Sequence, residues 1–228
     1  MCPKTILDEN KEYWTGRASG YSEVNRHELS TEQRQRWKSC LCDELTQHFS
    51  DRALTDLHVL DVGTGPGFFA ILLRELGCHV TAIDLTPAML AEAKENAGSL
   101  AAEIQFIEMN AEALRFADGS FDAVITRNLT WNLPHPQRAY AEWARVLKKG
   151  GLLLNFDANW YAYLFDETAQ AAYDKDRANS AEQGVWDQNV GAEGEHFDVM
   201  EDIARRVPLS YIRRPAWDLK QLSEVGLQ

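Results

Sequence analysis

The middle of the chain alternates between two patterns of hydrophobic positions. Residues 57–62 form an apolar run with two polar interruptions, which is typical of a strand buried on both faces. Gly63, Gly65 and Gly67 follow, and residues 68–76 then carry the pattern of a buried helix. Because glycine has no Cβ, the backbone can turn sharply here and approach a ligand closely. This stretch therefore predicts a strand, a tight glycine turn and a helix.

The same alternation of strand and helix continues along the chain. Further apolar runs of strand length lie at residues 80–84, 104–108, 121–126 and 152–156. Helical patterns between them lie at residues 88–97 and 137–147. This order predicts a mainly parallel sheet with right-handed crossovers, so the expected fold is α/β, doubly wound and Rossmann-like. Ligands of such sheets lie beyond the carboxyl ends of the strands, where Gly63, Asp84 and Asn110 should converge.

Two different patterns precede this core. Residues 30–49 are predicted to form a helix with Ser30 as N-cap and Gln33 completing a capping box. An apolar stripe on this helix should pack against the sheet, and it consists of Trp37, Leu41, Leu45 and Phe49. Residues 11–21 are instead aromatic and broken by glycines, and no core helix is predicted there.

The chain after the fifth strand departs from the alternation. Residues 158–216 are interpreted as an inserted segment that begins with aromatic residues and continues with many carboxylates. The expected organisation is one domain with four parts: an N-terminal lid and helix at 1–50, the core at 51–157, the helical cap at 158–216 and a last core helix at 217–228.

Composition narrows the classes of partner. The chain has 228 residues, which is enough for one large α/β domain with a cap, and a net charge of −12. That charge argues against nucleic acid as a substrate and against binding to an anionic membrane surface. A protein that binds phosphate groups needs a positively charged surface. Four cysteines without a Cys-x-x-Cys pair are interpreted as free thiols. With no signal peptide or membrane-spanning run found, the expected location is cytoplasmic.

The glycine turn separates two classes of nucleotide site. A dinucleotide site of the G-x-G-x-x-G type requires a third glycine where this chain has Phe68. The pattern is instead G-x-G-x-G preceded by Asp61, which resembles motif I of the class I S-adenosylmethionine (SAM) dependent methyltransferases, of the small-molecule, UbiE-like or methyltransferase-11-like type. Further segments resemble this family in order, at Asp84 and at residues 110–114, 118–124 and 145–151.

The resemblance implies that the chain binds SAM and releases S-adenosylhomocysteine. Asp84 is then expected to bind the ribose, the glycine turn to pass beside the methionine part, and Asn110 with Ala111 to contact the adenine. The cofactor residues expected on this basis are Asp61, Gly63, Thr64, Gly65, Gly67, Asp84, Leu85, Met89, Asn110, Ala111, Glu112 and Arg127.

The acceptor side is less defined by the sequence. In similar methyltransferases the N-terminal stretch covers the cofactor, and here the chain leaving the fifth strand enters further aromatic residues. The acceptor pocket is therefore expected between the lid and the inserted segment. The expected substrate residues are Tyr13, Trp14, Tyr21, Trp160 and Tyr161. No general base is identified, and the candidates near the methyl group are Asn128, Trp131, Asp157 and Tyr161.

The main functional hypothesis is methyl transfer from SAM to a small, neutral or cationic acceptor by in-line displacement. Positioning and exclusion of water can supply most of the acceleration, so no metal site is required or predicted. One alternative is a SAM-binding sensor or scaffold without catalysis. The other is an NAD-dependent oxidoreductase, against which Phe68 counts.

The sixth and seventh strands of the family are not found before Gln228. We expect either a truncated chain or a fold without this antiparallel hairpin. The fifth strand should then be a sheet edge with unpaired backbone groups. It should be covered by the inserted segment or by a partner chain, for example the second copy of a homodimer.

Overall fold

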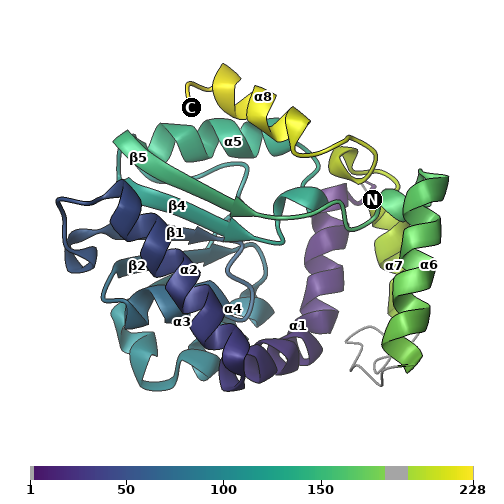
Figure 1. The fold of residues 1–228 in the computed structure, drawn as a ribbon, viewed down its shortest axis with the longest axis horizontal. Helices are drawn as coiled ribbons and strands as arrows, with labels where there is room; N and C mark the ends of the chain where they lie inside the picture. The colour runs from purple at the N-terminus through teal and green to yellow at the C-terminus, as the bar shows by residue number, and fades with distance from the viewer. Residues whose placement is uncertain (1–2, 183–194, 228) are drawn as a thin grey trace.

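The computed structural model describes residues 3–182 and 195–227, and its centre is a parallel sheet of five strands (Figure 1). The strand order is β3-β2-β1-β4-β5, and every neighbouring pair is parallel. The strands are β1 (His58–Val62), β2 (His79–Asp84), β3 (Ile104–Glu108), β4 (Phe121–Arg127) and β5 (Leu147–Phe156). The order reverses between β1 and β4, so their carboxyl ends border the crevice in which ligands of doubly wound folds bind. The predicted fold class is confirmed.

Helices cover both faces of the sheet. On one face lie α2 (Glu32–His48) and α3 (Phe68–Glu75), with α4 (Pro87–Ala97) beside them (Figure 1). The other face is covered by α5 (Pro136–Val146), onto which α8 (Ala216–Glu224) packs. Each face has its own core of fully buried side chains, because both faces of β1 and β4 are apolar. No helix in the described parts of the chain is long and apolar enough to cross a membrane.

The N-terminal part differs from the prediction. Residues 11–21 lie inside one long helix, α1 (Ile6–Ser30), which begins with a capping box between Thr5 and Asp8. The buried residues of α1 are Asn10, Ala18, Ser22 and Asn25. Because three of these four are polar, the buried positions of α1 do not form the continuous apolar stripe that predicts a core helix.

The junction between the first two helices also differs by one residue. Ser30 ends α1, and the N-cap of α2 is Thr31, whose hydroxyl accepts from the Gln33 amide at 3.4 Å. The capping box predicted between Ser30 and Gln33 is therefore wrong. The expected apolar stripe of α2 is confirmed, since Leu41 and Leu45 are fully buried against the sheet.

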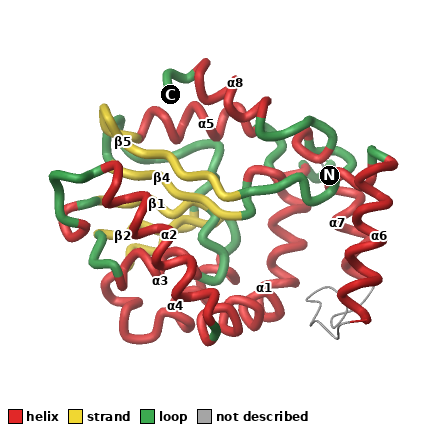
Figure 2. The backbone as a smooth tube through the Cα atoms, viewed as in Figure 1, coloured by secondary structure: helices red, strands yellow, loops and turns green. Residues whose placement is uncertain are grey.

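The segment after β5 forms α6 (Glu167–Glu182) and α7 (Glu195–Ala204), which lie beyond the carboxyl ends of the strands, with α7 packed against α1 (Figure 1). Part of the expected cap, residues 183–194, lies outside the described residues. In Figure 2 neither helix runs along the outer edge of β5, so the inserted segment does not cover that edge in its described part. Within the described chain, β5 pairs only with β4.

A buried carboxylate ties the opposite, amino-terminal ends of three strands together. Asp122 in β4 accepts from Arg52 at 2.6 Å, from the His58 amide at 2.8 Å and from Lys148 at 2.9 Å. Its side chain is 2% exposed. Burial by itself would raise the pKa of Asp122, but these three donors outweigh burial and hold the pKa at about 2.

Replacing Asp122 by Asn should lower the free energy of unfolding at pH 7 by about 2 kcal/mol, because the carboxylate pKa is depressed by about two units on folding. A depressed pKa stabilises the fold above the unfolded value near 4, and this stabilisation is lost as the pH falls toward 2. Denaturant unfolding should therefore show that the difference in free energy of unfolding between the wild type and Asp122→Asn becomes smaller as the pH falls from 7 to 3. A constant gap would contradict the assignment.

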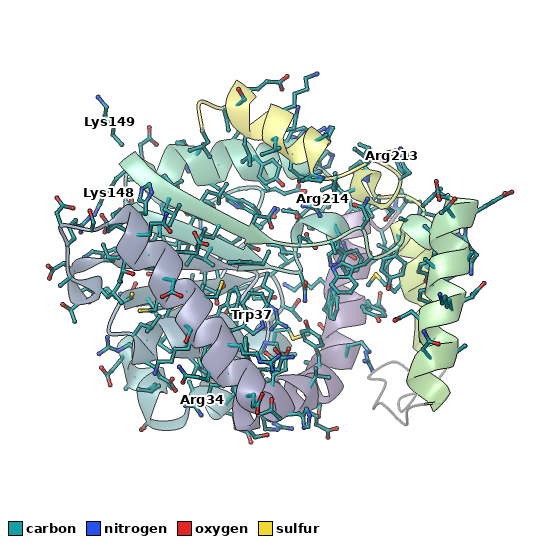
Figure 3. The ribbon with its side chains drawn as sticks, in the orientation of Figure 1. Arg34, Trp37, Lys148, Lys149, Arg213 and Arg214 are labelled. Carbon is teal, nitrogen blue, oxygen red and sulfur yellow. The ribbon has the colours of Figure 1, made fainter. Side chains whose placement is uncertain are left out.

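Two neighbouring lysines provide a matched control for this cluster (Figure 3). Lys148 binds Asp122, whereas Lys149 is exposed and has no ion pair within the described chain. The Lys148 side chain is 40% exposed, so Lys148→Met should cost less than about 1 kcal/mol. Lys149→Met should leave the unfolding midpoint unchanged.

Candidate functional site

The glycine turn after β1 requires glycine on steric grounds. Gly63 and Gly67 have φ values of 68° and 92°, in the left-handed region that side chains disfavour. A Cβ on Gly63 would lie 2.8 Å from the Leu129 side chain, and one on Gly67 would lie 3.2 Å from the backbone of Ala93 in α4. The turn is therefore packed against two neighbouring segments, and its remaining side faces the crevice.

Asp61 lies under the turn and orients it. Its carboxylate accepts from the Thr64 hydroxyl at 2.6 Å and from the amide of Ala70 in the first turn of α3. Asp61 is 2% exposed. Burial and, to a smaller extent, the nearby Asp84 raise its pKa to about 7, although both hydrogen bonds act to lower it. Asp61 thus joins the turn to the start of α3 and is poised to change its charge near neutral pH.

Asp84 fixes the same turn from the end of β2. One carboxylate oxygen accepts from the Gly65 amide at 2.9 Å, and the other accepts from the Thr86 amide at 2.8 Å at the start of α4. Burial raises the pKa of Asp84, and the bonds from the Thr86 and Gly65 amides oppose this. The residue is half-buried and borders the cavity, so its oxygens face both the turn and the ligand space.

A cavity of about 990 Å³, including its opening, lies over the carboxyl ends of β1, β2 and β4. Twelve of the residues that the sequence predicts for cofactor or substrate border it: Asp61, Gly63, Thr64, Gly65, Asp84, Leu85, Met89, Asn110, Ala111, Arg127, Trp14 and Tyr21. Asn128, one of the candidates near the methyl group, also borders it. Residues far apart in the sequence therefore meet in one space, as the parallel sheet predicts.

Two expected cofactor residues do not border the cavity. Gly67 packs against α4, as described above. Glu112 turns toward a loop, where its carboxylate accepts from the His135 amide at 2.7 Å and lies 3.1 Å from the His135 ring. The Glu112 amide donates to the Asn110 side-chain oxygen at 2.9 Å. Glu112 thus shapes the segment that carries Asn110 and Ala111.

One stripe of α1 forms the opposite wall of the cavity, and sequence reasoning found only part of it. Beside Trp14 and Tyr21, the wall contains Leu7, Asn10, Lys11 and Asn25. Their spacing follows the helical period, and the seven-residue step from Trp14 to Tyr21 was the available signal. Asn10 donates to the Asn132 carbonyl at 2.9 Å, and Lys11 pairs with Glu108 at 2.5 Å. These contacts hold α1 across the ends of the strands.

Arg127 also ties α1 to the sheet. Its guanidinium forms two bonds to the Glu28 carboxylate, at 2.6 and 3.1 Å, and lies 5.0 Å from the Trp37 ring centre and 4.8 Å from that of Phe68. The side chain therefore joins β4, α1, α2 and α3 at one point. The expected contact of its backbone carbonyl with the cofactor remains a prediction.

The loop after β4 carries the candidates for the reacting end. Asn128 has a φ of 55°, which is uncommon outside glycine, and its carbonyl accepts from the Trp131 ring nitrogen at 2.9 Å. Its side chain bonds the Tyr21 hydroxyl of α1. The Asp157 side chain is fully buried, and its Oδ2 accepts both from the Thr130 hydroxyl and, at 2.9 Å, from the Trp131 amide. Asp157 therefore holds this loop, and we do not propose it as a base.

The remaining aromatic candidates gather beside the cavity. Trp131 and Tyr161 have ring centres 5.0 Å apart, and Tyr13 and Trp14 have ring centres 5.1 Å apart. All four pack against the same apolar cluster, and we name them the aromatic wall. Trp160 is instead 50% exposed. Burial raises the pKa of Tyr161, so its hydroxyl is protonated at neutral pH and serves as a donor. The described residues contain no cluster of three or more potential metal ligands.

The raised pKa of Asp61 leads to a pH dependence. Between its ordinary value of 3.8 and the folded value of about 7, the folded chain holds more protons than the unfolded chain. The free energy of unfolding of the ligand-free protein should therefore fall as the pH rises through this window, by on the order of 2–4 kcal/mol. Asp61→Asn should show a flatter profile in urea unfolding at pH 5 and pH 8. Parallel profiles for the two proteins would disprove the assignment.

Comparisons with known proteins agree with this geometry. Residues 60–155 match a family described as a methyltransferase domain. An uncharacterized protein of Mycobacterium tuberculosis is 42% identical over 102 residues, covering 45% of this chain and 36% of that protein. The ubiquinone/menaquinone biosynthesis C-methyltransferase UbiE of Methylobacterium nodulans is 40% identical over 122 residues, covering 52% of this chain and 47% of that enzyme.

A crystal structure of a protein from Pyrococcus horikoshii aligns with a TM-score of 0.47 at 28% identity, covering 55% of this chain and 59% of that one. This chain spans only a third to a half of the length of the curated relatives named here. The matched residues 60–155 contain the end of β1, the glycine turn, β2 to β4 and most of β5. Over these residues the chain is therefore similar to methyltransferases, among them the UbiE enzyme named above.

Proposed function

We propose that this chain transfers a methyl group from SAM to a small-molecule acceptor by in-line displacement, leaving S-adenosylhomocysteine. The observation that carries the proposal is the convergence of the glycine turn, Asp84 and Asn110 on one cavity that α1 covers.

The residues around the cavity fit SAM in their chemistry. Asp84 has carboxylate oxygens that can accept from ribose hydroxyls, and Leu85 and Met89 offer apolar surface for adenine. The turn at Gly65 leaves room for the methionine part, because no Cβ projects there toward the Tyr21 ring across the cavity. SAM supplies an electrophilic methyl group on a sulfonium. The contribution of the chain is to orient both reactants and to exclude water, for which the α1 wall and the aromatic wall are suited.

The acceptor is proposed to lie near Asn128, between α1 and the rings of Trp131 and Tyr161. Rings there can exclude water, and the Tyr161 hydroxyl can donate to an acceptor oxygen. A neutral or cationic acceptor fits best, because the chain has a net charge of −12 and a cation can lie on a ring face. The names of two relatives, a C-methyltransferase of ubiquinone and menaquinone biosynthesis and a demethylmenaquinone methyltransferase, make demethylmenaquinone the first acceptor to assay.

Composition and the sheet edge support further proposals about the whole protein. The acidic charge favours a chain that binds neither nucleic acid nor an anionic membrane. The free thiols of Cys40, Cys42 and Cys78 fit a reducing compartment such as the cytoplasm. A homodimer is proposed through the outer edge of β5, which pairs with no strand in the part of the chain that the structure describes.

Binding of S-adenosylhomocysteine is the direct test of the cofactor site. Replacing Asp84 by Ala should weaken this binding by about 1–3 kcal/mol, because the ribose hydroxyls lose their acceptor and the Gly65 amide loses its partner. Isothermal calorimetry measures both affinities. The matched control is Asp43→Ala, an exposed aspartate on α2 that does not border the cavity.

The control should bind as tightly as the wild type. NAD should give no binding heat to either protein, because Phe68 occupies the position of the third glycine of a dinucleotide site. Equal affinity of wild type and Asp84→Ala for S-adenosylhomocysteine would remove Asp84 from the site. No binding by the wild type would overturn the proposed function itself.

The acceptor side has a separate test. An acceptor is first identified by screening for release of S-adenosylhomocysteine. With that acceptor, Tyr161→Phe should lower turnover about 3–10-fold, which corresponds to the loss of one hydrogen bond. Affinity for S-adenosylhomocysteine should stay unchanged, because Tyr161 does not border the cofactor cavity. Tyr211→Phe is the control, since Tyr211 is 55% exposed. If both variants retain full turnover, the acceptor lies elsewhere.

A further inference from the structure

A buried ionic cluster lies behind the loop that follows β4, and the proposed methyl transfer makes no use of it. It consists of Arg214, Asp157 and Asp218, whose side chains are 8%, 0% and 9% exposed. Arg214 belongs to the C-terminal segment, and Asp157 directly follows β5. None of the three lies within residues 60–155, the part matched to the methyltransferase family.

Arg214 contacts three different segments with its guanidinium fork. Its Nε donates to Asp218 at 2.8 Å, and its Nη2 donates to Asp218 at 2.9 Å and to the Thr130 hydroxyl at 2.8 Å. Its Nη1 lies 3.1 Å from an Asp157 oxygen. Only a planar group with several fixed donors can make these contacts together, so lysine could not replace arginine here.

These contacts end on the loop that borders the cofactor cavity. Asp157 accepts from the Thr130 hydroxyl and the Trp131 amide, so Arg214 and Asp157 hold this loop from two sides. The same loop carries Leu129, which packs on Gly63, and Asn128, which bonds Tyr21 of α1. A shift of residues 128–132 would therefore move one wall of the cavity and its contact with α1.

Attachment of α8 to the sheet does not by itself require this cluster. Trp217 and Leu222 already pack against the core over α5. Buried ion pairs are expensive, and apolar replacements are often as stable, so a buried cluster is weak evidence for a role in stability. Its distinctive property is directional: Nε and Nη2 of Arg214 fix both oxygens of Asp218, and Nη2 also fixes the Thr130 hydroxyl.

We propose that Arg214 is a positioning residue, through which the C-terminal segment sets the geometry of residues 128–132 at the cofactor cavity. This inference rests on the proposed function, because it assumes that the cavity binds SAM. Residues outside the matched methyltransferase domain would then affect the affinity for the cofactor.

The test uses two variants that weaken the same contact in different ways. Arg214→Lys keeps the charge and loses the fork, and Thr130→Val keeps all three charges and removes the shared hydroxyl. Each should bind S-adenosylhomocysteine about 5–10-fold more weakly by calorimetry, the effect of losing one hydrogen bond. Hydrogen exchange of the Trp131 amide should become faster in each. The double variant should be no weaker than the weaker single variant, because both act through one contact.

The neighbouring Arg213 is the matched control (Figure 3). Its side chain is 94% exposed, so Arg213→Lys should leave both the affinity and the exchange rate unchanged. If the wild type binds S-adenosylhomocysteine and both test variants bind it as tightly, the inference is wrong while the proposed function stands. A lower melting temperature with unchanged affinity and exchange would show a role in stability alone and would also overturn it. If Arg214→Lys does not fold, the affinity and the exchange rate of Thr130→Val alone decide whether the inference holds.

Discussion

The hydrogen bond from the Gly65 amide to Asp84 is the contact on which the rest of the site depends. It joins the turn after β1 to the end of β2 and fixes the turn in a left-handed conformation that only glycine adopts easily. The second oxygen of Asp84 places the start of α4, and Asp61 places the start of α3. Two carboxylates thus set a turn and two helices relative to one another before any ligand binds.

The sheet could be predicted from the sequence because strands buried on both faces carry continuous apolar runs. The helix α1 could not, because its inner face borders a ligand cavity and is polar at Asn10, Ser22 and Asn25. The N-cap at Thr31 was missed by one residue for a different reason: Ser30 and Thr31 are both good caps, and the length of the preceding helix decides between them.

The cavity residues at the strand ends could be predicted because they follow the strands at fixed spacing. The arrangement of the loop after β4 could not, because its geometry depends on contacts between distant segments. Asp157 follows a strand and was a candidate base by position, yet the structure surrounds it with donors from Thr130, Trp131 and Arg214. Nothing in the sequence around Arg214 or Thr130 indicates that they meet, since 84 residues separate them.

The inner face of α1 has a consequence for how firmly the cavity is covered. Asn10 and Asn25 border the cavity, but they lie on the same face as Leu7, Trp14 and Tyr21. Movement of α1 away from the strand ends would expose these apolar side chains to water together with the polar ones. Burial of the rings therefore favours the covered arrangement, and the asparagines supply hydrogen-bonding groups within it.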